Sequence, residues 1–175
     1  KNQKLELCQE IAQKIEKKES SHKITLAQNI GLIEVEIKMS KKGPILATMY
    51  QVLPYFGKIF GNRAEIAQLL NLTISDLMDY PIQEVSCGVP YVIVPVKTVE
   101  NIQNLTFNTQ IWEELQYELK DKSVYAFTPD GLLPNGDLHG RMFAPEIGIT
   151  EDPATGSANG PLACYLFKYN IKKGP

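Results

Sequence analysis

The chain has 175 residues, of which 43% are hydrophobic and 22% charged, and its formal net charge is −2. This composition is typical of a globular protein that can bury a core. It lacks the basic stripe of a nucleic-acid-binding protein, and no apolar run reaches the length of about 18 residues that a transmembrane helix needs. We therefore expect neither a nucleic-acid nor a membrane partner.

Three cysteines, Cys8, Cys87 and Cys164, are odd in number and widely spaced. This pattern favours reduced thiols in a cytoplasmic protein over a disulfide framework. The chain begins without Met and ends at Pro175, and we expect it to be a fragment of a longer polypeptide.

Hydrophobic spacing predicts the elements of the first third of the chain. It indicates an amphipathic helix over residues 5–19 and then a strand in which Ile33, Val35 and Ile37 alternate with charged residues. A returning strand is expected over residues 47–53.

Proline and glycine between residues 54 and 61 mark a change of unit. We expect residues 1–53 to be the remainder of an N-terminal lobe and residues 54–175 to form a C-terminal lobe. The spacing in the second lobe predicts a short helix capped by Asn62, strands over 91–96, 123–128 and 138–144, a helix through Trp112, Leu115 and Leu119, and a central helix over about 158–170. Strands outnumber helices and several follow one another directly, which predicts an α+β fold with a mostly antiparallel or mixed sheet.

The segment over residues 139–158, His-Gly-Arg-Met-Phe-Ala-Pro-Glu-Ile-Gly-Ile-Thr-Glu-Asp-Pro-Ala-Thr-Gly-Ser-Ala, carries the most specific signal. A strand leads into a proline-stiffened loop, which delivers small residues to the start of the last helix. The first turn of a helix has backbone N–H groups without partners and a partial positive charge. Because Thr155, Gly156, Ser157 and Ala158 carry little bulk, an anionic oxygen could reach these N–H groups.

Asp152 precedes this turn and is held extended by the proline that follows it. A carboxylate beside an anion site suits a group that accepts or donates a proton. The structural alternative is that Asp152, Thr155 or Ser157 caps the helix, which would stabilise it by about 1 kcal/mol without any chemistry. The residues alone leave both alternatives open.

Two neighbouring polar residues also have alternatives. His139 is either a proton shuttle or a surface histidine. Arg141 pairs either with a substrate carboxylate or with Glu146 or Glu151 in a structural bridge. With two histidines and no clustered ligands, we expect no metal site.

The run from Arg141 to Ala158, with its Glu-Asp-Pro-Ala-Thr-Gly-Ser-Ala core, closely resembles the C-terminal signature of the phenazine-biosynthesis PhzF-like family. Weaker similarities in two earlier stretches, which begin at Ala47 and Glu84, extend the resemblance over roughly residues 24–170. The resemblance implies a diaminopimelate epimerase-like fold, in which two pseudo-equivalent lobes each wrap a sheet around a central helix. The N-terminal lobe would be incomplete in this chain, which also stops before the family's closing strands.

The resemblance further implies an isomerase that acts on a small carboxylate-bearing substrate by acid/base proton transfer, without cofactor or metal, and as a homodimer. In that scheme Asp152 and Ser157 are catalytic, and the N–H groups near Gly156 hold the substrate. Because Thr155 and Ala158 are small and lie beside these groups, we expect them to bind the substrate as well. The family's general-base glutamate and its Cys-Gly-His-type motif have no match in this chain. We therefore expect the fragment alone to be inactive.

Two other functions are weighed against this one. The first is a binding protein on the same scaffold that has lost its chemistry. The second is a thiol-dependent epimerase, which would need a cysteine at the start of the helix, whereas Cys164 is expected one to two turns inside it. Cys87 is better explained as a small buried thiol than as a nucleophile.

Overall fold

The computed structural model describes residues 21–38, 46–133 and 136–171. The chain divides into two compact units, residues 1–52 and 53–175. The helix predicted over residues 5–19 lies outside the described residues. The assignment of the two units to an N-terminal and a C-terminal lobe stays a prediction.

The first unit contains a three-stranded antiparallel sheet with the order β1-β2-β3. Ile33, Val35 and Ile37 are buried while the residues between them face outward, so the predicted alternation is confirmed. The returning strand is shorter than predicted: it ends at Met49, and Leu53 is 92% exposed. The strands are β1 (Ser21–Gln28), β2 (Gly31–Lys38) and β3 (Leu46–Met49).

The second unit is built on a six-stranded sheet whose strands follow one another in chain order. Only β6 and β7 pair in parallel, and the other neighbours are antiparallel, which makes this the predicted mixed sheet. The strands are β4 (Tyr55–Ile59), β5 (Gln83–Ser86), β6 (Pro90–Pro95), β7 (Ser123–Thr128), β8 (His139–Ala144) and β9 (Ile149–Asp152).

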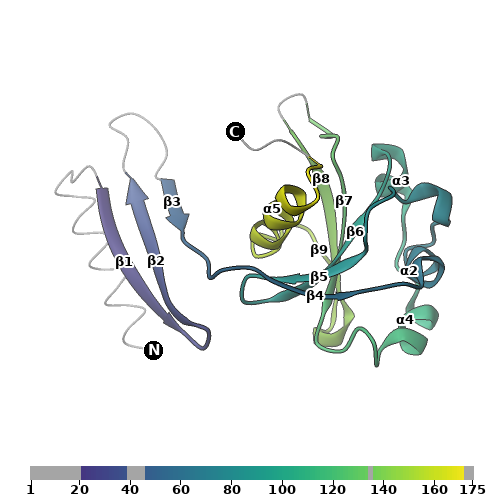
Figure 1. The fold of residues 1–175 in the computed structure, drawn as a ribbon, viewed down its shortest axis with the longest axis horizontal. Coiled ribbons are helices and arrows are strands. Elements are labelled where there is room, and N and C mark those ends of the chain that lie inside the picture. The colour runs from purple at the N-terminus through teal and green to yellow at the C-terminus, as the bar shows by residue number, and fades with distance from the viewer. Residues whose placement is uncertain (1–20, 39–45, 134–135, 172–175) are drawn as a thin grey trace. The chain divides into compact units, whose positions relative to one another are not determined.

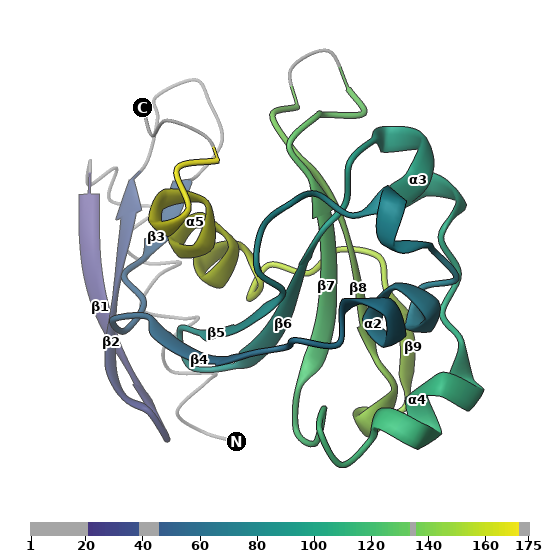
Figure 2. The same cartoon turned by 45° about the vertical axis from the view of Figure 1, so that its right-hand side comes forward.

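Helices cover both faces of this sheet (Figures 1 and 2). One face carries α2, α3 and α4, and the other carries α5 alone. The helices are α2 (Arg63–Leu69), α3 (Val99–Asn104), α4 (Thr109–Leu115) and α5 (Asn159–Lys168), with short 3-10 turns η1 (Ile74–Asp76) and η2 (Pro145–Ile147).

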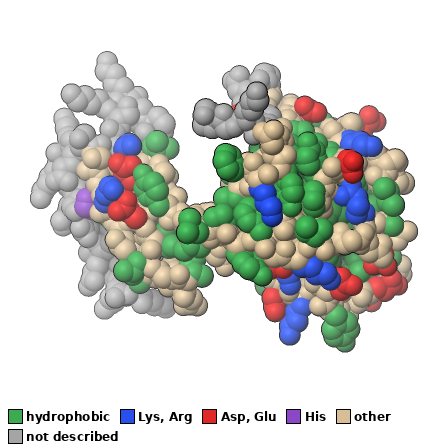
Figure 3. Space-filling view, viewed as in Figure 1, with side chains coloured by type: hydrophobic (Ala, Val, Ile, Leu, Met, Phe, Trp, Pro, Cys, Tyr) green, Lys and Arg blue, Asp and Glu red, His purple; other side chains and the backbone are tan. Residues whose placement is uncertain are grey.

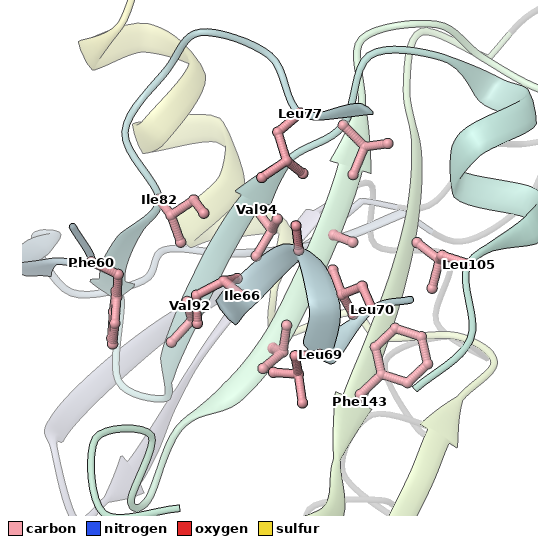
Figure 4. Packing of buried hydrophobic residues seen from close by; sticks show 14 of the residues in the cluster. Phe60, Ile66, Leu69, Leu70, Leu77, Ile82, Val92, Val94, Leu105 and Phe143 are labelled. Carbon is pink, nitrogen blue, oxygen red and sulfur yellow. The ribbon is translucent and has the colours of Figure 1, made fainter. Parts of the chain in front are cut away.

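Two hydrophobic cores follow from this arrangement, because successive side chains of a strand point to opposite faces. Val92 and Val94 of β6 point toward Leu69 and Leu70 on the α2 side, as Figure 4 shows. The intervening residues of β6 point toward α5. The core on the α5 side, called the α5 core below, consists of Val85, Tyr91, Ile93, Tyr125, Phe127, Met142, Ala144, Ala158, Leu162, Tyr165 and Leu166.

Several elements of the second unit differ from the sequence-based expectation. β4 occupies part of the stretch that was predicted only as a change of unit, and neither the strand β5 nor the short helix α3 was predicted. The segment predicted as a loop between residues 145 and 157 contains η2 and the edge strand β9. Thus Asp152 ends a strand, which fixes the direction of its side chain.

The visible face of the second unit mixes charges of both signs. In Figure 3, acidic and basic side chains are interspersed along its lower edge as drawn. None of the helices in the described parts of the chain is long and apolar enough to cross a membrane.

Candidate functional site

The sheet register places Asp152 on the same face as α5. Asp152 lies opposite Met142 of β8, and Met142 lies opposite Tyr125 of β7. Directly opposed residues of an antiparallel pair have their side chains on the same face. Met142 and Tyr125 belong to the α5 core, so the Asp152 side chain points toward the α5 side of the sheet, and that of Glu151 points to the other side.

The N-terminus of α5 has no capping side chain. Its N-cap residue is Ala158, which makes no side-chain capping bond, so the capping alternative for Asp152, Thr155 and Ser157 is wrong in this structure. Pro161, in the first turn, has no N–H group to donate. The Asn159 N–H bonds to the Gly156 carbonyl at 3.2 Å.

The loop before α5 is open to solvent. Ala154, Gly156 and Ser157 are exposed. A Cβ placed on Gly156 would meet no atom within 4 Å. The predicted low bulk at this tip is therefore accompanied by free space into which a ligand atom could fit.

Ala158 does not share this exposure. The residue is 0% exposed, and its methyl group packs in the α5 core. It was expected to bind substrate because it is small and near the helix start. Its complete burial removes it from the surface that a ligand could reach.

A hydrogen bond orients the Asp152 carboxylate. Thr155 Oγ1 donates to Asp152 Oδ2 at 2.7 Å, and both residues are half-buried. No other hydrogen bond to the Asp152 side chain is found among the described residues. The second carboxylate oxygen, Oδ1, is therefore available to a ligand.

Ser157 has a partner that the sequence did not reveal. Its Oγ lies 2.6 Å from the hydroxyl of Tyr91 on β6, and either group could be the donor. Tyr91 begins a continuous apolar run, so sequence spacing gave no sign that its polar end reaches the loop before α5. The contact fixes the position of Ser157 although this residue is exposed.

Arg141 is fully occupied by structural contacts. Its Nε and Nη2 donate to the two Glu151 carboxylate oxygens at 2.7 Å each. Its Nη1 donates to carbonyls of α3 and the residue after it, including those of Ile102 at 3.0 Å and Leu105 at 2.7 Å. Of the alternatives for Arg141, the structure supports the bridge to Glu151; Glu146 instead accepts a bond from Ser123.

These bonds also change the acidity of Glu151. The hydrogen bonds and positive charge of Arg141 hold the pKa of the Glu151 carboxyl below its usual value, against a smaller opposing effect of burial. Glu151 therefore stays charged and paired near neutral pH. It ties β9 to β8 and α3 immediately before Asp152.

A hollow of about 380 Å³ lies beside the ends of β8 and β9. It brings His139 and Asp152 to a common edge but does not include Ser157. Strand alternation places His139 on the Arg141 side of β8, and no hydrogen bond between His139 and Asp152 occurs among the described contacts. The lining residues are Gln103, His139, Gly140, Arg141, Glu151, Asp152 and Pro153.

Two cysteines meet on the α5 side of the sheet. Cys87, after β5, and Cys164, in the second turn of α5, are near enough for Cys164 to affect the acidity of Cys87. Burial, and to a smaller extent Cys164, raises the pKa of Cys87 to about 11. A nucleophilic cysteine needs a lowered pKa, so Cys87 does not suit thiol-dependent epimerisation.

The described parts of the chain hold no group of three or more His, Cys, Asp or Glu side chains placed to bind a metal ion.

Comparison with known proteins identifies similar chains. Residues 5–174 match the family model described as phenazine biosynthesis-like protein. The uncharacterized isomerase YfhB of Bacillus subtilis is 34% identical over 153 residues, which cover 86% of this chain and 52% of YfhB. The trans-2,3-dihydro-3-hydroxyanthranilate isomerase of Pseudomonas fluorescens is 28% identical over 149 residues, which cover 85% of this chain and 49% of that enzyme.

The fold is also found among solved structures. The PhzF-family phenazine biosynthesis protein of Bacillus anthracis superposes with a TM-score of 0.72 at 27% identity, covering 82% of this chain and 49% of that one. This similarity confirms the predicted α+β, diaminopimelate epimerase-like fold class. The chain spans about half the length of the relatives that it matches.

Proposed function

Because this chain belongs to the phenazine biosynthesis-like protein family, whose matched relatives are named isomerases, we propose that it supplies part of the active site of a cofactor-independent isomerase. The substrate would be a small molecule that bears a carboxylate, and the reaction would proceed by acid/base proton transfer. The observation that carries this proposal is the exposed N-terminus of α5, which has no capping side chain, together with the carboxylate of Asp152, of which one oxygen accepts a hydrogen bond from Thr155.

Each group has a role in this proposal. The N–H groups near Gly156 and Ser157 donate hydrogen bonds to the substrate carboxylate, with support from the α5 dipole. Thr155 holds one oxygen of Asp152, so that the other faces the substrate and exchanges a proton with it. Tyr91 holds Ser157, whose hydroxyl then bonds to the substrate.

No residue of this chain is assigned as the general base of the reaction. The glutamate expected from the family resemblance has no match in residues 1–175. We therefore propose that these residues alone bind the substrate without converting it. Free cysteines at Cys87 and Cys164 support the expectation of a cytoplasmic protein, and assembly as a homodimer stays a prediction.

The proposal is tested with Asp152→Asn and a matched control, Asp130→Asn, which changes an exposed carboxylate in another loop. The enzyme sample is the full polypeptide that contains residues 1–175 in the cell. The probe is trans-2,3-dihydro-3-hydroxyanthranilate, and its conversion is followed by NMR in D2O. Loss of the acid/base group should lower kcat by about 100-fold or more, while Asp130→Asn should keep the wild-type rate. Equal rates for the two variants would contradict the role of Asp152.

The hydrogen bond that holds Asp152 to Thr155 would also suit one alternative, a binding protein on the same fold in which Asp152 only shapes the loop. That protein would bind the probe without incorporating deuterium, and Asp152→Asn would leave its binding unchanged. Deuterium incorporation that disappears in Asp152→Asn would exclude this alternative.

A further inference from the structure

Tyr125 on β7 has a hydroxyl group without a hydrogen-bond partner among the described residues. The residue is only 8% exposed. No fully buried side-chain nitrogen or oxygen in the described structure lacks a partner. The hydroxyl oxygen of Tyr125 is therefore itself in contact with solvent, while most of the residue is packed in the α5 core.

Gly140 on β8 provides the room for this ring. A Cβ at Gly140 would lie 2.3 Å from the Tyr125 hydroxyl oxygen and 2.6 Å from the ring carbon that bears it. No side chain other than that of glycine fits there without moving the ring. Since Gly140 is diagonal to Tyr125 across the β7–β8 pair, the hydroxyl leans toward the end of β8 where the loop after Asp152 begins.

Tyr125 lies on the same face of the sheet as Asp152 and the start of α5. Tyr125, Met142 and Asp152 form one row across β7, β8 and β9 on the α5 side. Tyr125 and Asp152 are two strands apart, which corresponds to about 10 Å between their backbones. On the other side, the Tyr91 ring packs edge-to-face against that of Tyr125 at 6.3 Å, and Tyr91 contacts Ser157.

We propose that Tyr125 is a further substrate-binding residue of this site, whose phenolic O–H donates a hydrogen bond to an oxygen of the bound carboxylate-bearing molecule. The inference rests on the proposed function, because it takes the ligand to lie between Asp152 and the start of α5. A hydroxyl group whose ring is held by packing and by Tyr91 is well placed for this role, since little conformational freedom is lost on binding.

The protonation state of Tyr125 agrees with a donor. Burial, and to a smaller extent the neighbouring Tyr91, raises the pKa of the Tyr125 hydroxyl above its ordinary value. The group therefore keeps its proton throughout the neutral range. It can donate to an anionic or a carbonyl oxygen, and it adds no negative charge that would repel a carboxylate.

The test uses Tyr125→Phe, with Tyr117→Phe as the matched control because Tyr117 is 87% exposed. Binding of anthranilate, a small aromatic carboxylate, to the 175-residue chain is measured by NMR titration, and the urea unfolding midpoint is recorded for each variant. Removing one donor should weaken anthranilate binding about tenfold. The unfolding midpoint should not fall, because the hydroxyl leaves no protein partner behind, and Tyr117→Phe should match the wild type in both measurements.

A second variant tests the position of the ring. Gly140→Ala should weaken anthranilate binding as well, because the new methyl group displaces the Tyr125 hydroxyl. Its control is Gly61→Ala, where a Cβ would meet no atom within 4 Å.

The outcomes separate this inference from the proposed function. If the wild type binds anthranilate with shifts at the amides of Gly156 and Ser157, and Tyr125→Phe binds it equally well, the role of Tyr125 is wrong while the site stands. A lowered unfolding midpoint with unchanged affinity would show that the hydroxyl is structural, which also overturns the inference. If the wild type shows no binding at these amides, both proposals fail.

Discussion

Two neighbouring carboxylates, Glu151 and Asp152, have different hydrogen-bond partners because they lie on opposite faces of β9. Glu151 faces Arg141 and is bonded through both oxygens. Asp152 faces the α5 side, where only Thr155 donates to it among the described residues. The two acids are adjacent in the sequence. Because successive residues of a strand face opposite sides of the sheet, their side chains have different partners.

The Glu151–Arg141 pair gives a prediction about pH. The pKa of Glu151 in the folded chain is lowered from 4.5, so the pair stabilises the fold above about pH 4.5, and this stability is lost as the pH falls through the lower folded-state value. Glu151→Gln should lower the free energy of unfolding by about 1 kcal/mol at pH 7, a modest value because the pair is partly exposed. Urea unfolding at several pH values checks whether the difference from the wild type shrinks below pH 4.

The control for this experiment is Glu113→Gln, which changes an exposed carboxylate on α4. It should leave the free energy of unfolding within about 0.5 kcal/mol of the wild type. A Glu151→Gln difference that stays constant down to pH 3 would contradict the assigned role of the ion pair.

A substitution at Gly156 tests whether the exposed loop before α5 binds the ligand. Gly156→Ala adds a methyl group that meets no protein atom within 4 Å, so the fold should keep its stability or gain up to about 1 kcal/mol. The same methyl group would occupy the space proposed for the ligand, and we expect anthranilate affinity to fall about tenfold or more. Calorimetric titration of Gly156→Ala beside Gly61→Ala measures this effect; equal affinities would show that the ligand binds elsewhere.

At the scale of elements, the strands β6, β7 and β8 and the helix α5 could be predicted, whereas the edge strands β4 and β9, the four-residue strand β5 and the short helix α3 could not. The predicted bounds of β7 are the observed ones, and all six of its residues are buried. The helix α5 was predicted from the spacing of Leu162, Tyr165 and Leu166. β9 has exposed residues at Ile149, Thr150 and Glu151, so it lacks the apolar alternation that marks a strand. The six-residue helix α3 is too short for helical spacing to be recognised.

The candidate site shows the same limit. Local sequence identified the small residues before α5 and the carboxylate of Asp152. It could not reveal Tyr91 or Tyr125, because their roles depend on how β6 and β7 pair with strands that are far away in the sequence. Nor could it show that Ala158 is buried, since an alanine fits a ligand site and a core equally well.

The two sides of α5 make a prediction about packing. Leu166 is 8% exposed and belongs to the α5 core, while its neighbour Phe167 is 83% exposed. Leu166→Ala should lower the free energy of unfolding by about 2–5 kcal/mol through the cavity that it leaves. Phe167→Ala should change it by no more than about 0.5 kcal/mol. Urea unfolding of both variants checks this, and a larger effect of Phe167→Ala would mean that the assigned face of α5 is wrong.

At the scale of the whole molecule, the second unit contains both cores around its six-stranded sheet. Every buried member of the two cores lies between Phe60 and Leu166, and the candidate site is formed from the same unit. The first unit has its own three-stranded sheet. The site therefore depends, within the described residues, on the integrity of the second unit alone.

This organisation predicts that residues 53–175 fold as a separate polypeptide. Such a polypeptide should unfold in one cooperative transition, measured by circular dichroism in urea, because it retains both cores. It should also bind anthranilate as tightly as the 175-residue chain. A gradual, non-cooperative transition would contradict the independence of the second unit.

The most direct measurement is a crystal structure of the chain with anthranilate bound. We expect a carboxylate oxygen of the ligand about 3 Å from the backbone nitrogen of Gly156 or Ser157, with the ring between Asp152 and Tyr125. A ligand that is found only in the hollow beside His139, or that contacts neither the start of α5 nor Asp152, would contradict the proposed site.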